Sequence, residues 1–248
     1  MARKREKKKF KLWKFILEAV LMIAIIVGIV LCIHFFCKID EVEYKGDLGE
    51  FSAQEIASYM KKENIENTVW LWARSLIRHE YKMPMFEEYS VKMLSPHKVQ
   101  IKAYEKKFKG EIKQSDQYYY FTNGGILMKL SSDRVKKAPR IVGIKVKKPT
   151  LYEKVVADNK KNFDEVCKVA TAVGEYKFKV KKIVVDKKNE LTLVTDKISA
   201  FIKNTDNLDR KLVSFNDIYK SIKGKKLKKT VLDMSVVDLD GGYTAKKK

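Results

Sequence analysis

Hydrophobic residues follow one another almost without interruption near the start of the chain. Between Phe15 and Phe36 the only acidic, basic or imidazole side chains are Glu18 and His34, close to the two ends of the run. A bilayer core about 30 Å thick requires roughly 20 apolar residues in a helix. The segment 15–37 is therefore predicted to be a single transmembrane helix, with membrane-anchoring residues that include Leu21, Ile25, Val27, Ile29 and Leu31.

The flanks of this run predict its orientation. Residues 1–14 carry eight Lys or Arg side chains against Glu6 alone, so the positive-inside rule places this basic tail in the cytoplasm. A cleaved signal peptide would have a shorter apolar region that ends in small residues, whereas this one ends Ile33-His34-Phe35-Phe36-Cys37. The sequence favours a retained anchor with the bulk of the chain outside the cytoplasm.

Residues 38–105 then show short alternating and helical patterns. A half-buried strand is predicted at 39–44, and Ser52 with Glu55 has the spacing of a capping box ahead of a helix. A second helix is predicted from Val69 to His79. Two strands, 89–94 and 98–104, are joined by a short turn. The order strand, helix, helix, strand, strand predicts a small α+β unit with two helices over a three-stranded sheet.

Residues 106–240 are richer in strand patterns. Asn123-Gly124 lies between two apolar runs, which is a strong hairpin signal. Helices are predicted from Asn162 to Gly174 and over the Leu212–Ile222 periodicity, which Gly224 would end. Strands are predicted at 108–112, 117–121, 126–130, 139–143, 180–186, 191–195, 200–203 and 230–239, followed by a basic tail at 241–248. The fold class is α+β, with a strand-rich second domain that contains two helices.

The net positive charge of the chain indicates less about its function than the predicted membrane topology does. The chain has 53 Lys plus Arg against 31 Asp plus Glu, and 45 against 29 of these, about +16, lie beyond residue 37. Such a charge suggests nucleic acid in a cytosolic protein, but nucleic acid is not expected outside the cell. Anionic cell-wall polymers, lipid headgroups or an acidic partner fit the predicted location better than nucleic acid does, and a solvated Lys-rich surface is the favoured interpretation.

The sequence contains no clear pattern of catalytic residues. His34, His79 and His97 have no ligand or triad spacing, and the latter two are interpreted as surface residues. Cys167 shares a helical face with Phe163, Val166, Ala170 and Val173, which predicts a packed core thiol rather than a nucleophile. We predict no catalytic residue, no metal site and no cofactor.

The order of motifs resembles the FtsQ/DivIB family of bacterial cell-division proteins. The pieces that carry the resemblance are Val42–Gly46 with Ser52, Glu55 and Ile56; Tyr118–Phe121 with Asn123–Ile126; Ala138–Gly143; and Asn207–Leu212. Two places depart from the family pattern: the junction reads Glu105-Lys106-Lys107-Phe108 without the usual proline, and the first hairpin is led by Ser95-Pro96-His97-Lys98. The resemblance implies a POTRA domain at 38–105, a β domain at 106–240 and location at the division septum.

The same resemblance implies a non-enzymatic scaffold of the division machinery that binds FtsL and DivIC/FtsB, with septal wall synthases as further partners. An edge strand can pair with a strand of a partner, so the last predicted strand is the candidate binding segment: Thr230, Val231, Leu232, Asp233, Met234, Ser235, Val236 and Val237. The side chains of Leu232, Met234 and Val236 could equally pack the core. A membrane-anchored wall enzyme or wall-polymer binder is the alternative function.

Overall fold

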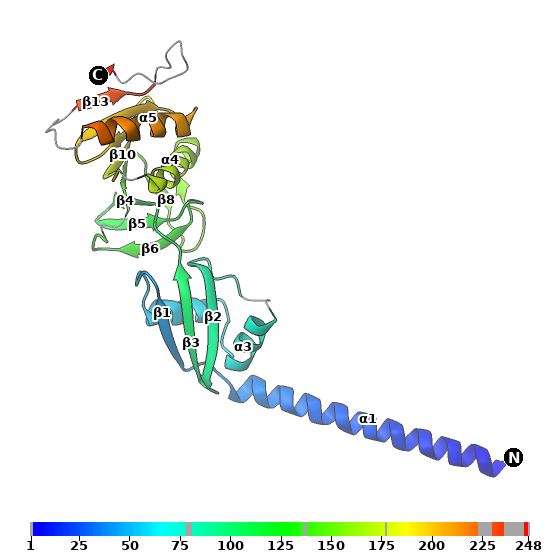
Figure 1. Cartoon of the computed structure of the whole chain (residues 1–248). Helices are drawn as coiled ribbons and strands as arrows, with labels where there is room; N and C mark the ends of the chain where they lie inside the picture. Colours follow the sequence, from blue (N-terminus) through cyan, green and yellow to red (C-terminus); the bar gives the residue numbers. More distant parts are fainter. Residues whose placement is uncertain are drawn as a thin grey trace. The chain divides into compact units, whose positions relative to one another are not determined.

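The protein divides into two compact units, 1–105 and 106–248, and the division falls at the boundary expected from the sequence. The computed structural model describes residues 2–77, 81–135, 138–176, 178–222, 230–235 and 246–247. His79, Gly224, Val236 and Val237 lie outside the described residues. Figure 1 gives the element labels used below, and five α-helices and many strands make the described chain a mixed α and β protein.

Helix α1 (Ala2–Phe36) contains the predicted membrane segment. Within its stretch Trp13–Phe36, the most apolar window of 18 residues has a mean hydropathy of 3.1, and none of that window is buried inside the protein, unlike the core helix of a soluble domain. The anchor residues Leu21, Ile25, Val27, Ile29 and Leu31 are all exposed to half or more of their surface. Among the described residues this is the one helix long and apolar enough to cross a membrane.

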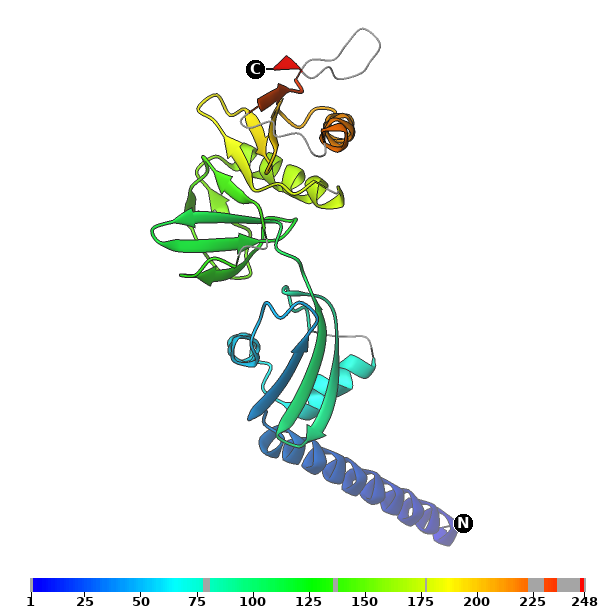
Figure 2. The ribbon, with the colours of Figure 1, turned by 60° about the vertical axis from the view of Figure 1, so that its left-hand side comes forward.

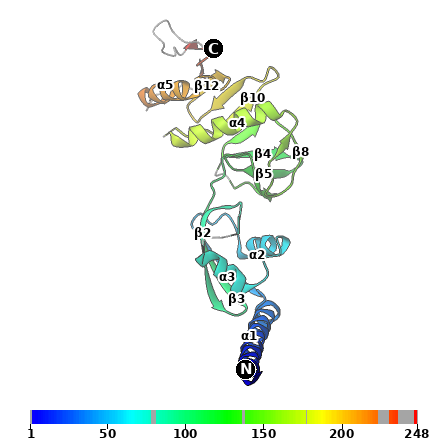
Figure 3. The same cartoon turned by 90° about the vertical axis from the view of Figure 1, so that its right-hand side faces the viewer.

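The first unit contains the predicted order of elements after α1. These are β1 (Glu41–Gly46), α2 (Ala53–Lys62), α3 (Thr68–Leu76), β2 (Phe86–Ser95) and β3 (Lys98–Glu105). The sheet order is β1-β3-β2, with β1 parallel and β2 antiparallel to the central β3. On β3, Val99 and Ile101 are buried while Lys102 and Tyr104 of the opposite face are exposed. Both helices therefore cover one face of the sheet (Figure 3).

Local hydrogen bonds determine where these helices begin. The Ser52 hydroxyl accepts from the Glu55 backbone N–H, and the Glu55 carboxylate accepts from the Ser52 N–H, so the predicted capping box is confirmed. Helix α3 begins at Thr68 because the Asn67 side chain caps it, and it ends at Leu76 with Ile77 as its carboxyl-terminal cap. The prediction that α3 reaches His79 is therefore wrong.

Glu105, the last residue of the first unit, ties together motifs that are 60 residues apart. Its buried carboxylate accepts from the Tyr44 hydroxyl at 2.5 Å and from the backbone N–H groups of Glu50 and Phe51. Burial, together with this carboxylate, raises the pKa of Tyr44. A Cβ atom at Gly46 would overlap the Glu105 carboxylate and the Tyr44 hydroxyl, so a larger residue there would displace these two side chains. The carboxylate thus joins the end of β3 to the end of β1 and the approach to α2.

The second unit is built on a nine-stranded sheet with the order β14-β13-β12-β11-β10-β7-β4-β5-β6. Figure 2 shows α5 nearly end-on beside the late strands. The elements are β4 (Gly110–Gln114), β5 (Gln117–Phe121), β6 (Leu127–Ser131), β7 (Arg140–Val142), β8 (Val146–Lys148), β9 (Val156–Ala157), α4 (Lys160–Ala172), a 3-10 turn (Val173–Glu175), β10 (Lys182–Val185), β11 (Leu191–Val194), β12 (Ile198–Lys203), α5 (Leu208–Ser221), β13 (Thr230–Asp233) and β14 (Lys246–Lys247).

The hairpin between β5 and β6 confirms the Asn-Gly signal, with a different turn. The residue with a positive φ is Gly125, at +69°, and the register shifts between Tyr120 and Phe121. A type I turn followed by a left-handed glycine and a bulge has this form. A side chain at Gly125 would press on Phe163 and Cys167 of α4, so the glycine also allows α4 to pack close to the hairpin.

Helix α4 packs its apolar face into the core. Cys167 is buried there, as predicted, and burial raises the pKa of its thiol to about 12. The helix starts at Lys160, because Asn159 caps it, and continues past Ala172 as a 3-10 turn through Gly174. The predicted bounds, Asn162 and Gly174, are corrected accordingly.

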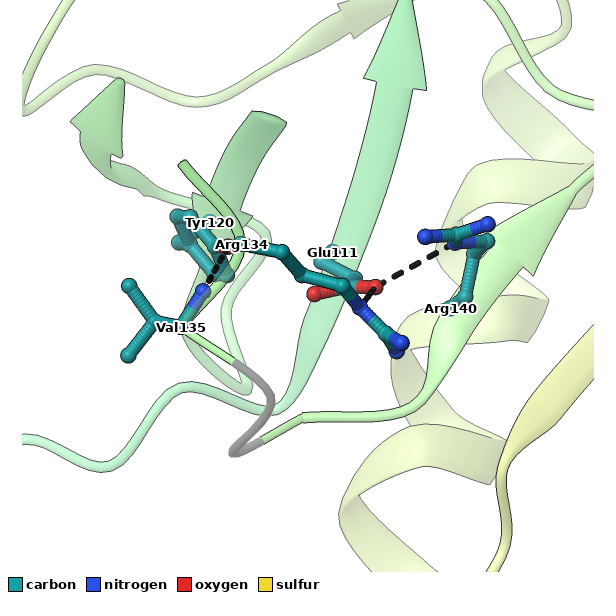
Figure 4. A network of polar contacts seen from close by, with 5 residues as sticks. All are labelled: Glu111, Tyr120, Arg134, Val135 and Arg140. Carbon is teal, nitrogen blue, oxygen red and sulfur yellow. Dashed lines mark hydrogen bonds and ion pairs between the residues drawn. The ribbon is translucent and has the colours of Figure 1, made fainter. Parts of the chain in front are cut away.

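A buried carboxylate on β4 pairs with two partly exposed arginines, one of them on β7. The Glu111 carboxylate is fully buried and its Oε1 accepts from Nε of Arg134 at 2.5 Å and from Nε of Arg140 at 3.3 Å (Figure 4). The neighbouring Tyr120 hydroxyl accepts from the Val135 N–H at 2.7 Å. These contacts join the segment before Arg140 to the middle of the sheet. Because the charged groups of this cluster pair with one another, we assign them a role in the stability of the fold.

Candidate partner-binding edge

Strand β13 lies near one end of the large sheet and pairs in parallel with β12. The register places Thr230 opposite Ile198, and Asp233 opposite Phe201. The Met234 N–H extends the ladder by donating to the Phe201 carbonyl at 2.8 Å. One side of β13 is thus satisfied by the protein's own sheet, and the other side of the strand is where a partner could pair.

Helix α5 and a buried lysine hold the end of β12 that supports β13. Lys211, on α5, is almost completely buried, and its Nζ donates to the Ile202 carbonyl at 2.8 Å and to the carbonyl and side-chain oxygens of Asn204 at 3.1 Å. Desolvation by burial lowers the pKa of this amine. Lys211 belongs to the Asn207–Leu212 motif, whose chemistry the sequence alone did not reveal. It fixes the turn between β12 and α5.

Two of the candidate side chains point inward. Met234 is fully buried in the core, and Leu232 packs against that core. The reading of these two side chains as core residues is confirmed. Thr230, Val231, Asp233 and Ser235 are half-buried. Recognition at this place would therefore depend mainly on the backbone of β13 and on the outward side chains.

The strand is shorter than predicted. It ends at Asp233, because the Asp233 carboxylate accepts from the Ser235 backbone N–H at 2.9 Å and from its hydroxyl at 2.5 Å. Such side-chain bonds two residues ahead compete with strand pairing and turn the chain. Met234 and Ser235 consequently follow the strand. Val236 and Val237 lie outside the described residues.

The outer side of β13 carries a very short strand from the end of the chain. Leu232 pairs with Lys247 and Asp233 pairs with Lys246, both antiparallel. Thr230 and Val231 lie beyond this two-residue ladder. No sequence pattern predicts β14, because a run of lysines has low strand propensity. The candidate edge is thus covered over half of β13.

The opposite end of the sheet differs. The outer side of β6 is bonded to the segment 152–155: the Leu127 N–H donates to the Glu153 carbonyl at 2.9 Å, and the Tyr152 N–H donates to the Leu127 carbonyl at 2.7 Å. A further bond joins Val155 to Gly125. This cover belongs to the folded core, whereas β14 is the chain's last strand. Of the two ends, the β13 end is better suited to strand exchange.

The two described histidines lie at different places in the first unit. His34 lies in the last turn of α1, and His97 lies in the β2–β3 turn, where its Nδ1 is 3.1 Å from the Lys38 carbonyl and 3.4 Å from the Asp40 carboxylate. Cys32, Cys37 and Cys167 are free thiols. In the described part of the chain no group of three or more His, Cys, Asp or Glu side chains could hold a metal ion.

Comparison with known proteins adds no identification. No protein-family model matches the chain, and the search of curated proteins gives no match.

Proposed function

We propose that the protein is a non-enzymatic scaffold of the bacterial division machinery, similar to the FtsQ/DivIB family. Helix α1 would anchor it in the cell membrane with its amino terminus in the cytoplasm. The first unit would act as a POTRA domain and the second as the β domain that binds the FtsL and DivIC/FtsB pair. Septal wall synthases and anionic wall polymers are further proposed partners.

One observation supports this proposal most directly: β13 is the second strand from the end of a nine-stranded sheet, and its outer side is covered only by the two-residue β14 within the described chain. A strand from a partner would offer a longer ladder than two lysines do. Main-chain hydrogen bonds then supply affinity, and alternate side chains supply specificity. The order of elements in the first unit and the apolar α1 agree with the proposed family.

Binding by strand addition requires backbone N–H groups of β13 that point away from β12 and toward the partner. Because the Met234 N–H points to β12, alternation along the strand directs the N–H of Val231 away from β12, toward the proposed partner. Proline at Val231 would remove that donor and spare the pairing with β12, as edge positions allow. Proline at Met234 would instead break a bond within the protein.

The test compares Val231→Pro with Val231→Thr in the full chain. Thr keeps the backbone N–H and the branched shape, so it is the matched control. We expect proline to weaken binding of the purified FtsL and DivIC pair about tenfold, since one hydrogen bond of about 1 kcal/mol and its neighbour are lost. Binding within threefold of the control would contradict strand addition at β13.

A second variant tests the same edge in case Val231→Pro misfolds. Removal of residues 241–248 deletes β14, so it should strengthen partner binding by exposing Leu232 and Asp233. Unchanged affinity would show that β14 does not occupy the binding edge. In cells, a fluorescent fusion of the full chain should concentrate at midcell before constriction, and uniform membrane fluorescence would remove the proposed function.

A further inference from the structure

Asn67 connects the end of α1 to the beginning of α3. Its side-chain Oδ1 accepts from the Trp70 N–H at 3.0 Å, which caps α3, while its Nδ2 donates to the Ile33 carbonyl at 2.8 Å. Backbone bonds add to this link: the Thr68 N–H donates to the Cys37 carbonyl at 2.9 Å. The first turn of α3 is therefore fixed within hydrogen-bonding distance of the last turn of α1.

Helix α3 and its carboxyl-terminal cap present large apolar side chains that the described residues leave partly exposed. Trp70 is 41% exposed, Leu76 is 63% exposed and Ile77 is 68% exposed. At the end of α1, Phe35 and Phe36 are exposed to a similar extent. An open groove runs between the two helices, with Phe35 on one wall and Trp70, Ala73 and Ile77 on the other. A soluble surface seldom gathers so many apolar side chains in one place.

Polar groups rim this surface in the pattern of a membrane interface. Arg74 and Lys38 line the groove, and the Arg74 guanidinium lies 4.5 Å from the centre of the Tyr81 ring. The acidic Glu66 lies at the same groove. Trp and Tyr side chains are enriched at the level of lipid headgroups, where Lys and Arg also reach the phosphates.

We propose that the exposed face of α3, defined by Trp70, Ala73, Arg74 and Ile77, is immersed in the headgroup region of the outer leaflet. The occupant of the groove is then lipid of the same bilayer that α1 spans. This inference depends on α1 crossing the membrane and is independent of the identity of any protein partner.

Continuity with the lipid surface of α1 favours lipid over a protein. The 24 residues Trp13–Phe36 form a helix of about 36 Å at 1.5 Å per residue, slightly longer than a hydrocarbon core of about 30 Å. The last turn of α1 thus lies at the hydrocarbon boundary. Because the groove has that turn as one wall, the molecules that surround α1 at this depth also contact Trp70 and Ile77.

Quenching of Trp70 fluorescence by brominated lipid tests this placement. The full chain with Trp13→Phe is reconstituted in phosphatidylglycerol and phosphatidylcholine bilayers whose acyl chains carry bromine near the headgroup. The contribution of Trp70 is obtained by difference from the same chain with Trp70→Phe, so Trp72 remains in both samples. We expect bromine to reduce the Trp70 emission by roughly half or more.

A matched control reports from the far end of the same domain. Tyr104→Trp, added to the Trp70→Phe chain, places an indole at a 65% exposed position six residues along β3 from Lys98, about 20 Å at 3.3 Å per residue. This indole should be quenched by aqueous iodide and not by brominated lipid.

Two results would overturn the proposal. If Trp70 were quenched by iodide as strongly as the control and not by bromine, the face would lie in water. If Trp70 were protected from both quenchers, a second copy of the chain or another protein would cover it. Because Trp70 is exposed, its replacement by phenylalanine should leave the fold intact, which circular dichroism of both samples checks.

Discussion

Replacement of Asn67 by alanine should loosen α3 and its connection to α1 at once. The side chain provides one N-cap bond to Trp70 and one bond to the Ile33 carbonyl, at 3.0 and 2.8 Å. Loss of an N-cap costs about 1 kcal/mol, and loss of a well-formed hydrogen bond costs about 1 kcal/mol more. Local opening of α3 should therefore be favoured by about 2 kcal/mol, close to a 30-fold change in an equilibrium constant.

Asn67→Asp separates the two contributions. Aspartate keeps the oxygen that accepts from Trp70, and its charge is favourable at the amino end of α3. It loses the N–H that donates to Ile33 and places negative charge near the carboxyl end of α1, which is unfavourable. We expect the favourable charge at the amino end of α3 to offset the lost bond to Ile33, so that α3 remains about as stable as in the wild type while the contacts between Ile39 and Glu66 open more often.

Hydrogen exchange of the full chain in lipid nanodiscs measures both effects. For Asn67→Ala, peptides that cover 68–76 should exchange about 30-fold faster, beginning with the Trp70 amide. For Asn67→Asp, the increase should be confined to peptides that contain Ile39, whose N–H donates to the Glu66 carbonyl at 2.8 Å. Equal acceleration of α3 in the two variants, or a change below threefold in Asn67→Ala, would refute the dual role of Asn67.

Two further predictions concern the second unit, and both are measured by chemical denaturation of the full chain. Gly143→Ala should destabilise it by about 3 kcal/mol or more, because φ is +92° and the new Cβ would overlap the Val185 carbonyl; Gly124→Ala, where the Cβ would make only ordinary van der Waals contact with Ile126 and no positive φ is required, is the control and should change little. Glu111→Ala should cost about 1.5–3 kcal/mol, since two partly exposed guanidinium groups lose their bonds to a buried carboxylate, whereas a loss below 1 kcal/mol would show that Arg134 and Arg140 are well solvated without it.

Much of the fold was predictable from periodicity and turn chemistry. The capping box at Ser52 and Glu55, the hairpin before Ile126 and the buried face of α4 follow from short-range patterns. The ends of helices were less predictable. Helix α5 begins at Leu208, four residues before Leu212, the first residue of the apolar periodicity that predicted this helix. Strands β8 and β9 are so short that they have no periodicity to detect.

The candidate site was predictable only in its location. The apolar alternation around Leu232 and Met234 predicted a strand late in the chain, but the hydrogen bonds from Ser235 to Asp233 that end it depend on side-chain geometry. The pairing of β14 with β13 also joins residues with no strand propensity. The roles of Asn67 and Lys211 could not be predicted for a similar reason. Each side chain donates to backbone carbonyls that only the tertiary structure brings near.

The space that Gly46 leaves for the Glu105 carboxylate has an evolutionary consequence. A change at either position disturbs the other, because a side chain at 46 would displace the carboxylate, and a shorter side chain at 105 would lose the bonds to the Tyr44 hydroxyl and to the Glu50 and Phe51 amides. Substitutions at 46 and 105 should therefore be inherited together in relatives of this chain. A pair of positions so far apart in sequence would then identify such relatives even where overall similarity has faded.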